Sequence, residues 1–150
     1  RHDDHQPLPR PNHVLKLSAK FDVVSCRRQC DLFGNLSFGF RNETSDITTG
    51  TDKITFRVPY NFYVQEVRAS LNVASTGSSV VVDVNASGSS ILSTEISIDA
   101  GETTSQTASV LPVISAPLIS DNSEDSLDVD QVGSTTAGKG LKVTLSGRRA

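Results

Sequence analysis

The residues that could carry chemistry stand in three places along the chain. Cys26 and Cys30 are separated by three residues, and the segment His2–His5 holds two imidazoles and two carboxylates. The third place is acidic, and its members are Asp121, Glu124, Asp125, Asp128 and Asp130. Thiolates, imidazoles and carboxylates are the side chains that metal ions prefer, so each place is first considered as a metal site.

The first two places lack what a metal site requires. A four-coordinate zinc ion needs two more soft ligands than Cys26 and Cys30 supply, and the nearest histidine is His13. A disulfide across three residues has awkward geometry, so we expect two free thiols. His2–His5 stands next to alternating prolines and is expected to be a solvated polar end. We therefore predict no metal-binding residue in either place.

The acidic group resembles a calcium loop only in part. The calcium-loop pattern places Gly at its sixth position and Glu at its twelfth, where this chain has Ser126 and Val132. Asp128 and Asp130 alternate with apolar residues, which favours the solvent face of a strand. Whether calcium binds near Asp121–Asp130 stays open, and protection from unfolding by calcium would reveal it.

Catalysis has little support in the sequence. All three histidines lie in the first 13 residues, so the rest of the chain has no imidazole to activate a serine. The patterns G-x-S-x-G, H-E-x-x-H and the phosphate loop are absent. The carboxylates stand in turns or on alternating faces, and no aromatic residue follows Tyr63 to hold a sugar. We predict that the protein is not an enzyme, has no catalytic residues and needs no cofactor.

Composition excludes several further classes. The 150 residues suit one domain, and 14 Lys and Arg against 17 Asp and Glu give a net charge of −3. A basic surface for nucleic acid is therefore not expected. No apolar run approaches the roughly 18 residues of a membrane span, and the first residues show no pattern of a secretion signal. All eight aromatic residues precede Val64, so Val, Ile, Leu and Ala must build the remaining core.

Residues 51–150 show the two-residue period of half-buried strands. The strands are expected at Ile54–Val58, Val67–Val73, Val80–Val84, Ile91–Ile98, Leu127–Val129 and Leu141–Leu145. Small residues mark turns between them at Ser75–Gly77, Ser87–Gly88 and Gly133–Gly140. Short strands with one apolar face each must stack in two layers. We predict an all-β fold, an antiparallel β-sandwich that is jelly-roll-like.

Residues 1–50 are expected to form an extended N-terminal arm. Pro7, Pro9 and Pro11 favour extended backbone, and apolar residues alternate over Leu15–Val23 and Leu36–Phe40. About 50 residues rarely form a sufficient core alone, so another subunit is expected to cover these apolar faces. The predicted partner-binding residues are Leu15, Leu17, Phe21, Phe33, Phe38 and Phe40.

An ordered set of short motifs then resembles a known family. The motifs are Arg57 with Pro59 and Tyr60, Thr76–Ser78, Asp83–Asn85, Gly88–Leu92, Asp128–Gly133 and Gly138–Val143. In this order they resemble a β-sandwich module that recurs in tailed-bacteriophage virion proteins. The resemblance spans Ile54–Ser105 and Asp128–Gly147, about two thirds of the chain, and does not include the first 50 residues.

The resemblance implies a structural protein on the virion surface, assembled in the host cytoplasm. Such modules commonly form trimers, so a homotrimer is expected. The favoured role is a capsid cement or decoration protein whose arm binds the major capsid protein or another virion protein. The first alternative is a tail or head fibre, or a receptor-binding protein, whose loops Ser115–Asp125 and Gly133–Gly140 contact host glycans. The second alternative is a carbohydrate-binding module, and the missing aromatic platform counts against it.

Overall fold

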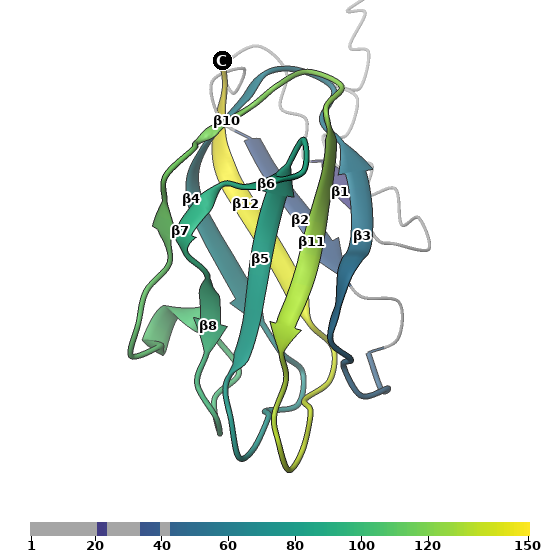
Figure 1. The fold of residues 1–150 in the computed structure, drawn as a ribbon, viewed down its shortest axis with the longest axis vertical. Coiled ribbons are helices and arrows are strands. Elements are labelled where there is room, and N and C mark those ends of the chain that lie inside the picture. Colours follow the sequence, from purple (N-terminus) through teal and green to yellow (C-terminus); the bar gives the residue numbers. More distant parts are fainter. Residues whose placement is uncertain (1–20, 24–33, 40–42) are drawn as a thin grey trace, which may run out of the picture.

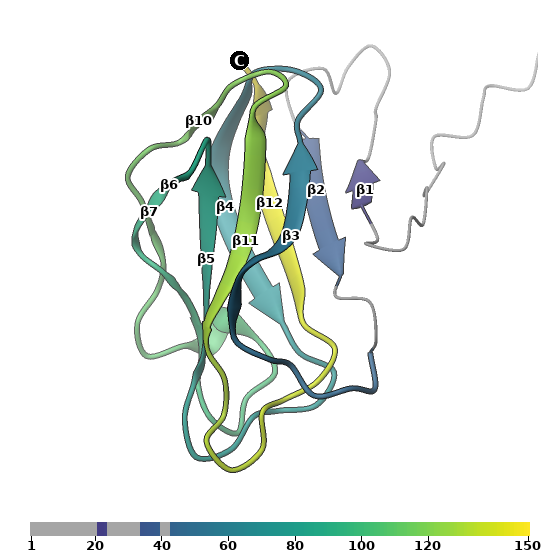
Figure 2. The ribbon, with the colours of Figure 1, turned by 45° about the vertical axis from the view of Figure 1, so that its right-hand side comes forward.

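The computed structural model describes residues 21–23, 34–39 and 43–150, and these form an all-β fold. Its strands run antiparallel in two stacked sheets, as Figures 1 and 2 show. The antiparallel β-sandwich predicted from the alternation is therefore confirmed. Within the described residues, no helix is both long and apolar enough to cross a membrane.

The first sheet has five strands, and the strand that comes last along the described chain lies at its centre. In spatial order the strands are β1 (Phe21–Val23), β2 (Gly34–Gly39), β12 (Lys142–Arg149), β4 (Phe62–Ser70) and β10 (Leu118–Ile119). Val143 of β12 pairs with Phe38 on one side and with Ala69 on the other. β12 therefore holds the two halves of this sheet together.

The second sheet places β11 between β3 and β5. Its strands are β3 (Gly50–Arg57), β11 (Glu124–Gln131), β5 (Val80–Ala86), β6 (Ser89–Ser90) and β8 (Ile96–Ile98), and the last two pair with β5. A small ladder joins β7 (Leu92–Thr94) to β9 (Val113–Ile114). One 3₁₀ turn, η1 (Ser105–Thr107), begins at Thr104, whose side chain accepts a hydrogen bond from the N–H of Gln106.

The core lies between the two sheets and is mostly aliphatic. Val82 and Leu127 from the second sheet and Leu145 from the first are fully buried. Phe38 and Phe56 bring aromatic rings into the same core, with their centroids 4.2 Å apart. Alternate residues of each strand supply these side chains, which is why the two-residue period in the sequence located the strands correctly.

Two glycines occupy positions where another residue would be strained or crowded. Ser87 and Gly88 have φ angles of 51° and 80° and form the two-residue turn of the β5–β6 hairpin, a geometry that glycine adopts readily. Gly147 lies beside a register shift between β12 and β4, where an added Cβ would collide with the carbonyl oxygen of Tyr63. A side chain at Gly147 would therefore push the two central strands apart.

The predicted boundary between residues 50 and 51 needs a correction. β2 lies before that boundary, yet it is an inner strand of the first sheet, between β1 and β12. Leu36 and Phe38 are each only 1% exposed. The second sheet of the same chain covers the apolar face that was expected to need another subunit, so the sandwich includes residues 34–39.

The same burial corrects one predicted partner-binding residue. Phe38 packs in the core of its own chain and does not present its ring to a partner. Phe21 belongs to β1, which pairs with β2. Four of the predicted residues lie outside the described part of the chain, namely Leu15, Leu17, Phe33 and Phe40. Their role stays a prediction.

Candidate functional site

The acidic residues singled out in the sequence do not converge on one site. Glu124 forms an ion pair with Arg57, with 2.7 Å between Oε2 and Nη2. Asp128 accepts hydrogen bonds from the side chain of Asn85 at 2.8 Å and from the N–H of Asp52 at 2.7 Å. Each of these carboxylates thus has its own protein partners, and most of them tie β11 to its neighbouring strands.

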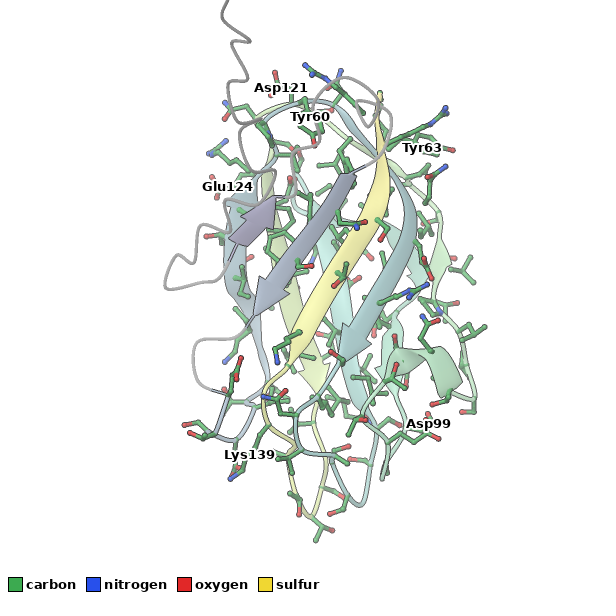
Figure 3. All side chains as sticks on the ribbon, turned by 180° about the vertical axis from the view of Figure 1, so that it is seen from behind. Tyr60, Tyr63, Asp99, Asp121, Glu124 and Lys139 are labelled. Carbon is green, nitrogen blue, oxygen red and sulfur yellow. The ribbon has the colours of Figure 1, made fainter. Side chains whose placement is uncertain are left out.

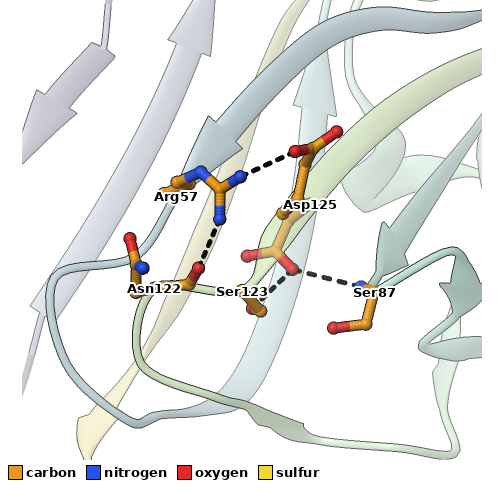
Figure 4. Close-up of polar contacts among 6 residues, drawn as sticks. Arg57, Ser87, Asn122, Ser123 and Asp125 are labelled. Carbon is orange, nitrogen blue, oxygen red and sulfur yellow. Dashed lines mark hydrogen bonds and ion pairs between the residues drawn. The ribbon is translucent and has the colours of Figure 1, made fainter.

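Asp125 lies near the start of β11 and is buried, and its hydrogen bonds are drawn in Figure 4. Its Oδ1 accepts hydrogen bonds from the hydroxyl of Ser123 at 2.7 Å and from the N–H of Ser87 at 3.3 Å. Its Oδ2 is buried without a hydrogen-bond partner. Burial raises the pKa of Asp125, while Ser123, Ser87 and the charge of Arg57 lower it in part. The residue joins two turns and is a structural carboxyl group rather than an exposed ligand.

Asp130 does belong to a cluster, but with partners that were not assigned from the sequence. A carboxylate oxygen from each of Asp83, Glu95 and Asp130 lies within 4.8 Å of the other two. A register shift between Val129 and Gln131 leaves Asp130 outside the regular pairing with β5, which redirects its side chain. Asp83 was named in the sequence only as part of the motif Asp83–Asn85, and Glu95 was not singled out.

Proton sharing is the chemistry that this carboxylate cluster supports. Desolvation, followed by the charges of Asp130 and Asp83, raises the pKa of Glu95. Desolvation also raises the pKa of Asp130, together with the charges of Asp83 and Asp128. Three oxygens at this spacing could also hold a divalent cation. Asp83 already accepts a hydrogen bond from the hydroxyl of Ser90 at 2.6 Å, so one of the three carboxylates is engaged within the protein.

The most distinctive surface of the described chain is apolar. Five of its six exposed large apolar side chains lie in or beside the segment Ser109–Ile119, and we call them the apolar strip: Tyr63, Val110, Leu111, Val113 and Leu118. Their exposed fractions run from 36% for Tyr63 to 59% for Leu111. Tyr63 joins the strip because β4 pairs with β10 through Tyr63 and Leu118. Figure 1 shows this segment in light green along one edge of the sandwich.

A groove lies between this segment and β4. Its volume is about 450 Å³, and its walls include Val67 of β4 and Ser105 of η1 on one side and Leu111 and Val113 on the other. Neither the groove nor the strip was predicted from the sequence. A signal was present, because residues 103–120 contain no Asp, Glu, Lys or Arg. An uncharged stretch of this length in a surface loop indicates a contact surface.

Of the two tyrosines at the end of the sandwich where β4 begins, Tyr63 is exposed and Tyr60 is partly buried against the core. The guanidinium of Arg148 lies 5.1 Å from the ring centroid of Tyr63, and that of Arg149 lies 5.0 Å from the centroid of Tyr60. Figure 3 shows both tyrosines at this end of the molecule. Sugar rings bind by stacking on free aromatic faces, and here a cation covers one face of each ring.

The remaining predicted features are placed as follows. The loops Ser115–Asp125 and Gly133–Gly140, which were predicted to contact host glycans in the fibre alternative, lie at opposite ends of the sandwich, as the labels of Asp121 and Lys139 in Figure 3 show. Their contact with glycans stays a prediction. Cys26, Cys30 and His2–His5 lie outside the described residues.

Comparison with known proteins adds no assignment. No protein-family model, curated protein or solved structure matches the chain. The resemblance to a tailed-phage virion module therefore stays a prediction, based on the motifs named above.

Proposed function

We propose that the protein is a non-enzymatic structural component of a tailed-phage virion, and specifically a cement or decoration protein on the capsid surface. In this proposal the sandwich stabilises the shell from outside, and the N-terminal segment attaches it to the major capsid protein or to another virion protein. The protein acts as an oligomer, with a homotrimer as the expected state, and needs neither metal nor cofactor.

The observation that carries the proposal is the concentration of exposed apolar side chains in one strip. Val110, Leu111, Val113 and Leu118 are each more than half exposed, whereas among the other large aliphatic side chains of the described residues only Val73, at 45%, is exposed. Apolar side chains gathered on one surface favour contact with another protein. A durable binding module would need such a surface, and it would not need a deep polar cavity.

The polar groups of the described residues support the same proposal. Asp125 and Asp128 hold strands and turns together through short hydrogen bonds. Residues 14–150 contain no histidine, so the described part of the chain brings no imidazole to the cluster of Asp83, Glu95 and Asp130. These arrangements serve the stability of a sandwich better than they serve bond cleavage.

The proposal is tested on virions produced from the genome that encodes the chain. Intact particles are separated by density-gradient centrifugation, and the chain is quantified against the major capsid protein by mass spectrometry. A cement protein should be present in a number comparable to the major capsid protein. A few copies per particle would indicate a fibre or receptor-binding protein, and absence from the particles would overturn the proposal.

Attachment through the N-terminal segment can be tested separately. The variant lacking residues 1–20 keeps every described strand of the sandwich. We expect it to fold, with an unchanged circular dichroism spectrum, and to bind particles that lack the native chain far more weakly than the full chain does. Full occupancy by this variant would show that the sandwich itself makes the attachment.

A further inference from the structure

We infer that the groove beside β4 binds residues Leu15–Ala19 of a second copy of this chain. The bound segment adds to the sheet as a strand next to β4. This inference deepens the proposed function, because it assigns the contact between copies to a named surface and a named segment. Three features of the molecule support it: the open edge of β4, the distribution of charge and the reach of the chain.

The edge of β4 is open along the groove. Near the start of β4, the N–H of Val64 donates to the carbonyl of Pro117. Near the end of β4, the N–H of Ala69 donates to the hydroxyl of Ser105. Backbone groups of an antiparallel strand alternate between its two sides, so the N–H and C=O of Val67 lie on the same side as those of Ala69. That side borders the groove, which Val67 lines. An extended peptide can therefore add to the sheet at this point.

The apolar strip supplies the side-chain contacts for such a peptide. Leu111 and Val113 stand on the wall of the groove opposite β4 and are 59% and 51% exposed. The occupant should be an extended segment with apolar side chains at every second position. Leu15, Leu17 and Ala19 have this spacing, and polar residues stand between them.

Charge favours this occupant. Residues 1–42 contain seven Lys and Arg against four Asp and Glu, whereas residues 43–150 contain seven against thirteen. Within residues 10–20, Arg10, Lys16 and Lys20 are the only charged residues. Glu66 lines the groove, where it forms an ion pair with Arg68 at 2.6 Å. A basic segment is thus drawn to a domain with a net charge of −6.

The segment that binds in the groove cannot come from the same copy of the chain, because the chain is too short to span the distance. β1, which begins at Phe21, is separated from the groove by β2, β12 and β4. At about 4.8 Å between strands, an added strand beside β4 would lie about 19 Å from β1. Ala19 is two residues from Phe21 and can reach only about 7 Å. Residues Leu15–Ala19 therefore cannot lie along β4 of their own copy while β1 is paired with β2.

A contact of this kind joins unlike surfaces, a segment of one copy and the groove of the next. Such head-to-tail contacts close into a ring when the rotation between copies allows it. The expected homotrimer is one such ring. A contact between two identical grooves would instead produce a twofold dimer.

The test uses two complementary variants of the full chain. Leu111→Asp with Val113→Asp damages the groove, and Leu15→Asp with Leu17→Asp damages the segment. Mass is measured by light scattering during size-exclusion chromatography over a range of protein concentrations. We expect the native chain to associate and each variant to be monomeric. An equimolar mixture should form a 1:1 complex, because one variant keeps an intact segment and the other keeps an intact groove.

Two controls establish that association depends on the groove and the segment. Val73→Asp adds the same kind of charge at a side chain that is 45% exposed outside the strip, and it should associate as the native chain does. A synthetic peptide of residues 10–20 should bind the segment variant and not the groove variant, and added salt should weaken this binding. A native chain that stays monomeric, a mixture that stays monomeric, or a segment variant that still associates would each overturn the inference.

The outcome is independent of the proposed function. A monomeric chain that nevertheless sediments with phage heads in high copy number would overturn only the inference about the groove. A chain that associates through the groove but is absent from virions would overturn only the proposed function.

Discussion

Strand β2 and the apolar strip show opposite outcomes of similar sequence patterns. Both contain Leu or Phe residues among small or polar neighbours, but Leu36 and Phe38 are 1% exposed, whereas Leu111 and Leu118 are more than half exposed. β2 lies between β1 and β12 and faces the second sheet. The strip lies beyond β4, at an edge where within the described residues the two-residue strand β10 ends the sheet.

The difference teaches that alternation identifies an apolar face but does not identify what covers it. β2 was assigned to a partner contact because the start of the sandwich was placed at residue 51. Ser115–Asp125 was predicted to be a loop, yet Leu118 and Ile119 form β10 beside β4. The position of a strand within the sheet order, which depends on pairing between distant residues, decides which apolar side chains stay exposed.

Deleting β2 should have the largest effect on the fold. A variant lacking residues 1–39 loses the strand that pairs with β12 along Gly34–Gly39 and exposes the core that Leu36 and Phe38 cover. We expect it to be unfolded or aggregated, as judged by circular dichroism and light scattering. The variant lacking residues 1–20 is the control and should fold. A cooperative unfolding transition in the variant lacking residues 1–39 would show that the sandwich folds without β2, so that β2 would belong to the N-terminal arm.

Truncating one core side chain should have the next largest effect. Phe38→Ala leaves a cavity beside Phe56 and should lower the free energy of unfolding by about 3–5 kcal/mol, measured by urea denaturation. Val113→Ala is the matched control at the strip, where the loss should stay within about 0.5 kcal/mol. If the two variants lost similar amounts of unfolding free energy, β2 and the apolar strip would not differ in how firmly their side chains are packed.

The carboxylate cluster extends the comparison to polar groups. The pKa values of Glu95 and Asp130 are raised, so the folded chain keeps these protons to higher pH than the unfolded chain does. Their contribution to stability is therefore complete below the ordinary carboxyl pKa, about 4, and is lost as pH rises through the raised values. Asp130→Asn should raise the free energy of unfolding at pH 7 by less than about 1 kcal/mol, because Glu95 and Asp130 are exposed.

The prediction for Asp130→Asn is tested by the pH dependence of its free energy of unfolding relative to the native chain. The advantage of Asp130→Asn over the native chain should grow between about pH 4 and pH 7, as measured by urea denaturation at each pH. Asp121→Asn changes the net charge equally at an exposed carboxylate outside the cluster and is the control for a general effect of net charge. A parallel rise in both variants would show a general effect of net charge.

The smallest effect on stability is expected at the strip. Leu111→Asp and Val113→Asp replace side chains that solvent already reaches, so the free energy of unfolding should change by about 0.5 kcal/mol or less. Thermal unfolding at low protein concentration measures this change without a contribution from association. A loss as large as that of Phe38→Ala would show that the strip packs within its own copy.

Much of the fold could be predicted from the sequence, because local alternation determines which face of each strand is apolar. Val80, Val82 and Val84 were expected to share one face, and all three are buried. The hairpin turn at Ser87–Gly88 followed from residue types that tolerate positive φ. Pro59 was expected at an edge or a bend, and it lies in the bend between β3 and β4.

The candidate sites could be predicted only in part, because they depend on contacts between distant residues. Asp130 meets Glu95 and Asp83 through the pairing of β5 with β11 and through a bulge, and neither the partner nor the bulge has a local signature. The groove arises where β9 passes β4 at a distance, and a single sequence does not encode that spacing in any short motif.

The central place of β12 has a consequence for how the protein is made. During synthesis, β2 and β4 leave the ribosome well before residues 142–149, the strand that must lie between them. Until those residues emerge, β2 and β4 both lack the partner that joins them, and both present apolar side chains to chaperones or to other nascent chains. A ribosome that stalls before residue 142 would thus release a product that cannot close its first sheet and that cellular proteases would recognise as unfolded.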